Sequence, residues 1–309
     1  MKVLVYIEAK EGTPLQGSLE LLSVEKGLGE VFAVTVEDSE AAKKAAEFGA
    51  KVVVLKTGEL TEDAQVAALE GTIKEVAPEL VLFSGTQLGK DLAPRLAQRF
   101  EAGCITDVTG MEQTDAGVEF VRPAFGGNVL EHLNVTGNLQ FATVRSGSFS
   151  KPEAAEGSVE EKEVALSDAV KAKILDAAKE ISEAVDLEGA DVIVTGGRGM
   201  GDAEGFKLVE ELAALLGGVV GASRPAIEEG WASRAHQVGQ SGKIVAPKLY
   251  IACGVSGAMQ HVSGIMGSKY IVAINKDEAA SIFDIADVGI VGDVKEILPL
   301  LIEEIKNRK

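Results

Sequence analysis

Two polar residues, Gln260 and His261, stand among small residues in "LYIACGVSGAMQH" (249–261), just past an aliphatic run typical of a buried strand. Gly254 and Gly257 leave space there, and a helix expected to begin near Gly257 would offer backbone N–H donors. Open α/β sheets bind ligands at this carboxyl edge of their strands. A lone histidine is more often structural, but this position favours ligand contact. No second histidine or carboxylate follows at metal-ligand spacing, so we predict no metal site.

A second candidate is "VIVTGGRGMGDAEGF" (192–206), whose pattern predicts a strand, a glycine-rich turn and the start of a helix. Such a turn presents free N–H groups and the positive end of a helix dipole, so it suits a diphosphate. It departs from the dinucleotide fingerprint, because Asp202 occupies the place of the third glycine. The next strand ends at Ser223 and Arg224, without an acidic residue to hold a ribose. We expect a nucleotide but find NAD disfavoured. A turn that only packs helix on strand is the alternative.

Three further features have ordinary explanations when each is taken alone. Arg224 could be a surface ion-pair residue, and Gln240 with Ser241 could belong to a plain polar loop in "HQVGQSGKIVAPKLY" (236–250). The stretch "GTQLGKDLAPRLA" (85–97) fails as a phosphate-binding loop, because its glycines are too closely spaced. The sequence contains no nucleophile elbow and no Ser/His/Asp arrangement.

The elements that must position these residues follow from the hydrophobic pattern. In the first half, strands are expected at 2–9, 30–37, 50–57 and 78–86, with helices at 39–49 and 62–77. This alternation predicts a parallel sheet with helices on both faces, that is, an α/β fold. The stretch 117–150 is rich in Gly and Asn and has period-two segments, which predicts an antiparallel extension.

The pattern changes in the middle of the chain and then resumes. Residues 151–168 are charged and predict a connecting segment, and a helix is expected over 168–182. Further strands are expected at 219–223, 248–254, 270–275 and 288–293. We therefore predict two domains, 1–186 and 187–309, the second being a doubly wound parallel sheet.

The bulk composition limits the classes of function. The 309 residues are enough for two domains, and the hydrophobic content of 46% argues against disorder. The formal net charge of -18 disfavours nucleic acid and anionic membrane surfaces as partners. Cys104 and Cys253 stand far apart and predict no disulfide framework. The chain starts with a strand pattern rather than a targeting segment and has no bilayer-length apolar run, so we expect a cytoplasmic protein without direct membrane insertion.

Taken together, several stretches resemble one family, the alpha subunit of electron transfer flavoprotein, which includes the FixB proteins. The matching stretches are "GGRG", "SRPA", "VGQSGKIVAPKLY", "CGVSGAMQH" and "AINKDEAASIFDIADVGIVGD". They lie in order between about residues 196 and 298, so they are far more specific than a single glycine motif. The first domain is similar more loosely, through its opening strand and "GKDLAPRLA".

The resemblance implies a heterodimer with a beta subunit, an N-terminal nucleotide-binding-like α/β domain and a C-terminal FAD-binding domain. Arg198 and its glycines would cradle the diphosphate. Three side chains would tune the redox potential: Arg224 against the flavin ring, Ser241 near flavin N5, and His261, protonated or as a donor, near the C2 carbonyl. The implied FAD-binding residues are Gly197, Arg198, Gly199, Ser223, Arg224, Val238, Gly239, Gln240, Ser241, Ser256, Gly257, Ala258, Met259, Gln260, His261, and the adenosine contacts Asn275, Asp293 and Val294.

The function that the resemblance implies is that of an electron carrier rather than a substrate-converting enzyme. Such a protein takes single electrons from flavin dehydrogenases, for example the acyl-CoA dehydrogenases of fatty acid beta-oxidation, and passes them to a membrane quinone oxidoreductase or another acceptor. Three alternatives stand beside it: an electron-bifurcating variant that uses NADH, an NAD(P)-linked oxidoreductase with its own substrate, and a non-catalytic nucleotide-binding module. The colour of a bound flavin separates the carrier and its bifurcating variant from the other two.

Overall fold

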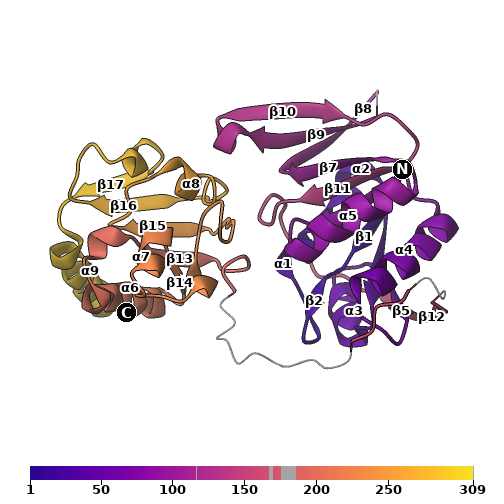
Figure 1. Cartoon of the computed structure of the whole chain (residues 1–309), viewed down its shortest axis with the longest axis horizontal. Helices are drawn as coiled ribbons and strands as arrows, with labels where there is room; N and C mark the ends of the chain where they lie inside the picture. The colour runs from indigo at the N-terminus through magenta and orange to yellow at the C-terminus, as the bar shows by residue number, and fades with distance from the viewer. Residues whose placement is uncertain (116, 167–169, 175–185, 309) are drawn as a thin grey trace. The chain divides into compact units, whose positions relative to one another are not determined.

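The computed structural model divides into two compact units, residues 1–179 and 180–309 (Figure 1). The described residues are 1–115, 117–166, 170–174 and 186–308. Both units are built on parallel β-sheets, which confirms the predicted α/β class. The domain boundary between residues 186 and 187 stays a prediction, because the segment just before it lies outside the described residues. Most of the helix predicted over 168–182 also lies outside them.

Seven parallel strands form the central sheet of the N-terminal unit, in the order β12-β5-β4-β1-β6-β11-β7. Their bounds are β1 (Lys2–Tyr6), β4 (Glu30–Val36), β5 (Lys51–Lys56), β6 (Leu80–Ser84), β7 (Gly103–Val108), β11 (Gln140–Val144) and β12 (Ser158–Glu163). Side chains alternate across β1: Val3 and Val5 enter one apolar layer, whereas Leu4 and Tyr6 enter the other. The sheet is therefore covered on both faces, as its continuous aliphatic strands require.

Each face of this sheet has its own helices. The first apolar layer takes side chains from α1 (Gln16–Glu20), η1 (Leu21–Val24), α2 (Glu25–Leu28) and α3 (Ser39–Ala46). The second takes them from α4 (Glu62–Val76) and α5 (Gln87–Arg99). A short hairpin of β2 (Ala9–Lys10) and β3 (Thr13–Pro14) follows β1. The helices at 39–46 and 62–76 confirm the sequence prediction.

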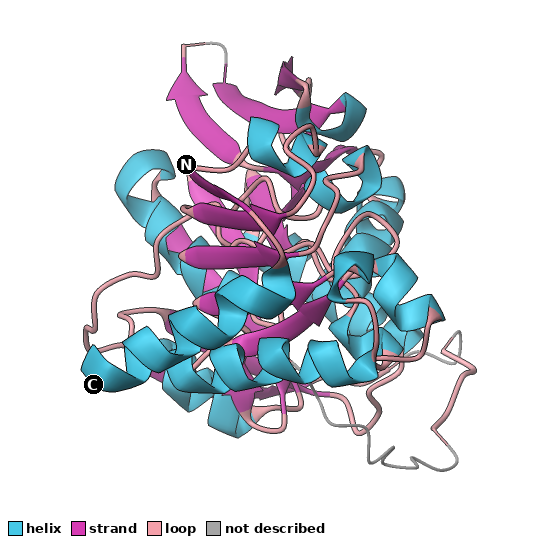
Figure 2. Cartoon of the chain, turned by 90° about the vertical axis from the view of Figure 1, so that its left-hand side faces the viewer, coloured by secondary structure: helices cyan, strands magenta, loops and turns pink. Residues whose placement is uncertain are grey.

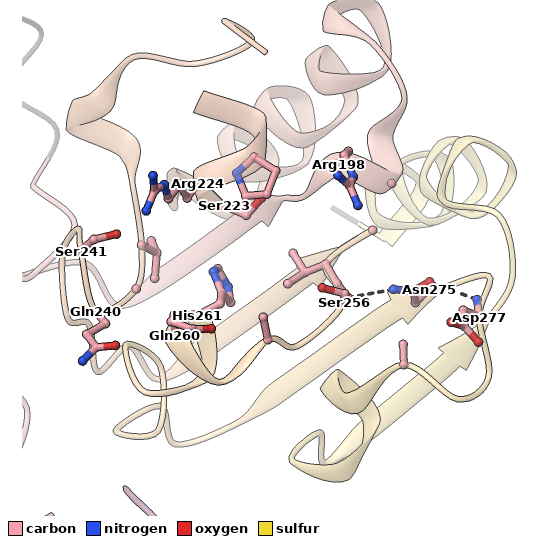
Figure 3. A pocket seen from close by; sticks show the side chains of 18 residues that line it. Arg198, Ser223, Arg224, Gln240, Ser241, Ser256, Gln260, His261, Asn275 and Asp277 are labelled. Carbon is pink, nitrogen blue, oxygen red and sulfur yellow. Dashed lines mark hydrogen bonds between the residues drawn. The ribbon is translucent and has the colours of Figure 1, made fainter. Parts of the chain in front are cut away.

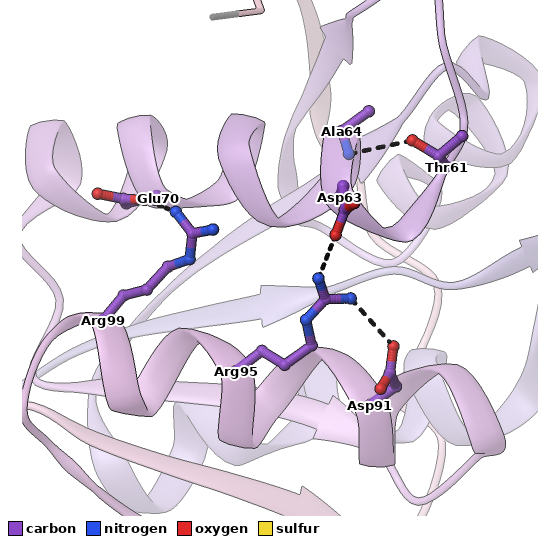
Figure 4. A network of polar contacts seen from close by, with 7 residues as sticks. All are labelled: Thr61, Asp63, Ala64, Glu70, Asp91, Arg95 and Arg99. Carbon is purple, nitrogen blue, oxygen red and sulfur yellow. Dashed lines mark hydrogen bonds and ion pairs between the residues drawn. The ribbon is translucent and has the colours of Figure 1, made fainter. Parts of the chain in front are cut away.

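Ion pairs join the two helices of the second face (Figure 4). Arg95 on α5 pairs with Asp63 on α4 and with Asp91 on its own helix, and Arg99 pairs with Glu70 at 2.7 Å. These side chains are partly exposed, and exposed pairs contribute roughly 0–1 kcal/mol each. The buried apolar layer, rather than these pairs, therefore holds α4 and α5 on the sheet.

Two sequence predictions for this unit need correction. The antiparallel extension exists as a three-stranded sheet beside β7 (Figure 1), made of β8 (Gly110–Thr114), β9 (Gly117–Ala124) and β10 (Val129–Asn134), with η2 (Phe125–Gly127) between the last two. Its predicted range extended too far, because β11 is a fully buried parallel strand of the large sheet. The predicted connecting segment contains β12, a charged edge strand beside β5.

A bidentate ion pair fastens the end of β11 to β7, and it supports a stability prediction. Arg145 donates to Asp107 at 2.9 and 2.6 Å, and its side chain is only 13% exposed. We expect Arg145→Met to cost about 2 kcal/mol, because it leaves a carboxylate without its partner. The control Arg122→Met breaks the more exposed pair with Glu131 and should cost less than about 1 kcal/mol. Urea unfolding followed by circular dichroism measures both, and equal losses would contradict the assignment.

The C-terminal unit is a five-stranded parallel sheet in the order β14-β13-β15-β16-β17. The strands are β13 (Val192–Gly196), β14 (Val219–Ala222), β15 (Leu249–Cys253), β16 (Ile271–Asn275) and β17 (Val288–Val291). The chain moves from β13 outward to β14 and then returns to β15 on the other side of β13. This reversal leaves a crevice at the carboxyl ends of β13 and β15, where doubly wound sheets bind their ligands.

The two faces of the C-terminal sheet are covered differently. On one face α6 (Ala203–Leu216) and α9 (Val294–Arg308) pack side by side, and α9 leads to the C-terminus marked in Figure 2. The other face is covered by loops that include Val238 and Val245 and by a short helix that contains Ile282. The remaining helices are short: η3 (Arg198–Met200), α7 (Arg224–Glu228), η4 (Arg234–His236), α8 (Met259–Val262) and η5 (Ser281–Asp284). Across the described parts of both units, no helix has the length and apolarity needed to span a bilayer.

Candidate functional site

A cavity of about 640 Å³ opens at the carboxyl ends of β13, β14, β15 and β16 (Figure 3). Its volume lies within the range of roughly 300–1,000 Å³ that is usual for small-molecule and cofactor sites. It occupies the crevice that the strand order creates, so its place follows from the topology of the sheet.

The cavity brings together most of the residues predicted for a cofactor. The predicted residues that line it are Arg198, Gly199, Ser223, Arg224, Val238, Gly239, Gln240, Ser241, Ser256, Ala258, Gln260, His261 and Asn275. Gly197, Gly257, Met259, Asp293 and Val294 are not among its lining residues. Met259 is 60% exposed on α8, and Val294 is buried in the core with α6. That any of these residues contacts a cofactor stays a prediction.

The glycines of the turn after β13 serve close backbone packing. The N–H groups of Gly197 and Gly199 donate to the carbonyl oxygens of Cys253 and Gly254, at 2.8 and 2.9 Å. A Cβ on Gly197 would lie 2.3 Å from the Gly254 oxygen, so a larger residue cannot fit. These two N–H groups are therefore used within the chain, and the exposed Arg198 is the charged group that this turn offers to an anion.

Asp202, which breaks the dinucleotide fingerprint, has a structural role. Its carboxylate accepts a hydrogen bond from the Gly205 N–H at 2.7 Å and caps the start of α6. It also pairs with Lys295 at 2.9 Å. The hydrogen bond from Lys295 and that from Gly205 hold the pKa of Asp202 below its usual value. A negative charge therefore occupies the position where NAD-binding folds use a glycine to pack the helix closely on the strand.

The loop that carries Gln240 and Ser241 is closed on itself. The N–H of Lys243 donates to the Gln237 oxygen at 2.7 Å, and the Gly239 N–H donates to the Lys243 oxygen at 3.0 Å. The Gln240 N–H donates to the Gln260 oxygen at 2.7 Å and so ties the loop to α8. The Gln237 amide donates to Ser241 Oγ at 2.9 Å. Because Oγ accepts this bond, the Ser241 proton is free to point elsewhere.

The cation predicted to face the flavin has a partner in this structure. Arg224 begins α7, and its Nε pairs with Glu228 one turn later at 2.8 Å. Both side chains are mostly exposed, at 67% and 60%. Such an exposed pair is weak and exchanges readily with other partners. Arg224 therefore lines the cavity as a mobile positive charge whose effect Glu228 partly offsets.

Asn275 holds the cavity wall rather than presenting free polar atoms. Its amide nitrogen donates to the Val255 oxygen at 2.8 Å, and its oxygen accepts from the Asp277 N–H at 3.0 Å (Figure 3). These bonds fix the turn after β15 to the turn after β16. An adenosine contact by Asn275, as the sequence suggested, would have to share these atoms.

His261 is buried at the cavity wall and has one unpartnered ring nitrogen. Its Nε2 is 2.9 Å from the Tyr250 hydroxyl, whereas Nδ1 has no hydrogen-bond partner. Burial lowers the pKa of His261 to about 4, although the nearby Val238 carbonyl opposes this shift. The imidazole is therefore neutral at pH 7. Of the two possibilities considered from sequence, this lowered pKa favours a neutral donor over a protonated imidazole, and the contact of His261 with a flavin stays a prediction.

The buried His261 makes stability depend on pH. Its pKa is about 4 in the folded chain and about 6.5 in the unfolded chain, so the unfolded state binds a proton first as the pH falls. Above about pH 6.5 His261 is neutral in both states and does not change the free energy of unfolding. As the pH falls from about 6.5 to about 4, the free energy of unfolding decreases by about 3 kcal/mol. Trp231, the only tryptophan, lies in the C-terminal unit and reports its unfolding. We expect the free energy of unfolding of His261→Gln to depend less on pH between about 4 and 6.5. An unchanged pH dependence in this variant would contradict the assignment.

The cavity suits a nucleotide cofactor that needs polar partners. Two buried polar atoms of its lining residues lack partners in the structure, Ser223 Oγ and His261 Nδ1. Each unpaired buried polar group costs the folded protein roughly 1–3 kcal/mol. A ligand that forms hydrogen bonds with these two atoms would remove that cost and would therefore bind more tightly. Arg198 and Arg224 add positive charge to an otherwise acidic protein. The residues present therefore fit a flavin nucleotide: cations for its phosphates and ring, donors for its carbonyl oxygens, and apolar wall for its rings.

Some lining residues escaped the sequence prediction. They are Pro225, Gly254, Val255, Asp277 and Ala280. Gly254 carried a signal, because it follows a strand and was expected to leave space. Asp277 and Ala280 carried none, since the loop after β16 enters the wall only when the sheet is assembled. No three His, Cys, Asp or Glu side chains gather as metal ligands in the described part of the chain.

Comparison with known proteins assigns both units to one family of models. Residues 3–169 match the electron transfer flavoprotein domain, and residues 186–266 match the electron transfer flavoprotein FAD-binding domain. The chain is 40% identical over 322 residues to the electron transfer flavoprotein subunit alpha of Thermoanaerobacterium thermosaccharolyticum, covering 99% of this chain and 98% of that protein. It is 40% identical over 317 residues to the subunit of the same name from Bacillus subtilis, covering 99% and 97%. A third relative, the acryloyl-CoA reductase electron transfer subunit beta of Anaerotignum propionicum, is 37% identical over 351 residues, covering 99% and 95%.

Proposed function

Because the chain belongs to the electron transfer flavoprotein alpha-subunit family, we propose that its C-terminal unit binds FAD in the cavity and that the protein carries single electrons. The observation that carries this proposal is the cavity at the strand-order reversal, with Ser223 Oγ and His261 Nδ1 buried and unpaired in its lining. FAD supplies the ability to accept and release one electron at a time. The chain itself contributes binding, orientation and electrostatics.

The predicted site residues divide this work by their chemistry. Arg198 neutralises the diphosphate, and the tight crossing of Gly199 and Gly254 lets the backbone come close to it. Arg224 places positive charge near the flavin ring and stabilises added negative charge there. Ser241 and His261 donate hydrogen bonds, since Gln237 and Tyr250 occupy the opposite side of each group. The titratable side chains of the cavity, Arg198, Arg224, His261 and Asp277, offer charge and donors rather than an acid–base pair, which supports a carrier.

The partners of the proposed carrier follow from its family. We propose a heterodimer with an electron transfer flavoprotein beta subunit, since the relatives are named as subunits. The proposed donors are flavin dehydrogenases such as those of fatty acid beta-oxidation, and the proposed acceptor is a membrane quinone oxidoreductase. One relative is named as an electron transfer subunit of acryloyl-CoA reductase, and this name refers to an acyl-CoA substrate. That name supports dehydrogenases of acyl-CoA compounds as the class of partner.

The deciding experiment is to co-express the chain with its candidate beta subunit, purify the complex and record its visible spectrum during anaerobic reduction. We expect a stable heterodimer with one bound FAD that accepts electrons singly. Two flavins per heterodimer would favour the electron-bifurcating variant, and the test is then whether NADH reduces the complex. A colourless complex that does not take up added FAD would overturn the proposal and leave a nucleotide-binding module.

A further inference from the structure

The residue behind His261 is Tyr250, the second residue of β15 and fully buried. Its hydroxyl lies 2.9 Å from His261 Nε2, and the two ring centroids are 6.2 Å apart. Tyr250 does not line the cavity, so it cannot touch a ligand there. It can act on a ligand only through the imidazole, whose other nitrogen has no hydrogen-bond partner in the structure.

The direction of this hydrogen bond decides what His261 offers to the cavity. A neutral imidazole has one N–H donor and one acceptor nitrogen. If Tyr250 donates to Nε2, the proton of the ring must be on Nδ1, and Nδ1 is a donor. If Nε2 donates to the tyrosine oxygen, Nδ1 is an acceptor and cannot bind a carbonyl oxygen of the ligand.

The buried groups around Tyr250 favour the first direction. Burial raises the pKa of Tyr250, so the phenol stays protonated and has a proton to donate. Of the two bonded groups, the phenol is the more acidic donor and the imidazole nitrogen the more basic acceptor. The hydrogen bond between these two groups therefore runs from the Tyr250 hydroxyl to His261 Nε2.

We propose that Tyr250 is a positioning residue for His261: its hydroxyl donates to Nε2 and thereby fixes the neutral tautomer in which Nδ1 carries the proton and serves as the donor to the cavity ligand. The tautomer itself is a property of the chain alone, whereas its use as a donor to a flavin carbonyl rests on the proposed function. Ser241 is arranged in the same way, since Gln237 donates to it from behind.

The first test measures the tautomer without any ligand. The chain has three histidines, so ¹⁵N-histidine labelling gives three imidazole patterns, and His261→Gln identifies the one of interest. Long-range ¹H–¹⁵N spectra of the full chain should show Nδ1 protonated and Nε2 unprotonated. Tyr250→Phe should shift His261 to a mixture of tautomers or to protonated Nε2. Thr195→Val should leave the tautomer unchanged, because Thr195 Oγ1 has no hydrogen-bond partner in the structure. Tyr270→Phe, at a half-exposed tyrosine, is the matched control and should also leave it unchanged.

The second test measures FAD affinity of the heterodimer. Tyr250→Phe should weaken it about tenfold, the value of one net hydrogen bond, whereas Tyr270→Phe should not change it. Protonated Nε2 in the unaltered chain would overturn the inference, even if Tyr250→Phe failed to fold. An unchanged tautomer in Tyr250→Phe would overturn it as well, whatever happens to affinity. Failure of the unaltered heterodimer to bind FAD would instead count against the proposed function, and the tautomer result would stand by itself.

Discussion

Gly257→Ala is expected to destabilise the C-terminal unit by about 4 kcal/mol and to abolish FAD binding. Gly257 has φ +84, a conformation that costs a residue with a Cβ roughly 1–2 kcal/mol. A Cβ at this position would lie 2.1 Å from the backbone nitrogen of Ile282. The Ile282 side chain is fully buried in the core, so this residue has no free space to move into. Backbone must therefore move, and such overpacking costs roughly 1–3 kcal/mol more. The shift would displace Ser256 and Ala258, which line the cavity on either side.

The measurement is urea unfolding followed by the fluorescence of Trp231, which packs against the core of the C-terminal unit. The control is Gly217→Ala at the end of α6, where φ is +65 but a Cβ would meet no atom within 4 Å. It carries the backbone strain without the collision and should cost only about 1 kcal/mol. Equal losses in the two variants would show that the contact with Ile282 is unimportant.

Arg224→Ala is expected to lower the reduction potential of the bound flavin by about 50 mV. A charge about 4 Å from the ring stabilises an added electron by roughly 1–4 kcal/mol, depending on how far water screens it. One electron corresponds to about 2.3 kcal/mol per 100 mV. Because the Arg224 side chain is 67% exposed, the effect should lie near the lower end of that range. Potentiometric titration of the FAD-loaded heterodimer measures it.

Two neighbouring variants make this prediction specific to charge. Arg224→Lys keeps the charge and should lower the potential by less than half as much. Glu228→Gln removes the carboxylate that pairs with Arg224 at 2.8 Å, so it should raise the potential slightly. A potential that does not change in Arg224→Ala, or that falls in Glu228→Gln, would remove Arg224 from the redox site.

The sequence by itself determined the α/β class and most of the strands. Runs such as those at 2–6 and 249–253 are continuous and aliphatic because parallel strands are buried on both faces, and this pattern is local. It also located part of the cavity, and the family resemblance supplied most of the other lining residues. Loops that follow strands share one edge of a parallel sheet, so glycines and polar residues there point to a site before any fold is known. Gly199 and His261 were found in this way, whereas Ser223 was assigned to the site only through the family resemblance.

The tertiary structure alone decided the features that depend on pairing between distant segments. β12 is charged and looks like a connection, but it is an edge strand because β5 offers unpaired backbone groups beside it. β11 follows an antiparallel hairpin in sequence, yet it inserts between β6 and β7. No local signal predicts such an insertion, since it depends on which edges are free when the sheet closes.

The same reason governs the chemical state of the site. Nothing in the types or spacing of Tyr250 and His261 fixes a tautomer, and no local pattern shows that Ser223 Oγ is left without a partner. Residue types and spacing predicted a site at the carboxyl edge of the second sheet, where the structure has its cavity. Burial and hydrogen bonding, which exist only after distant segments pack together, decided that His261 is neutral and which of its nitrogens is engaged within the chain.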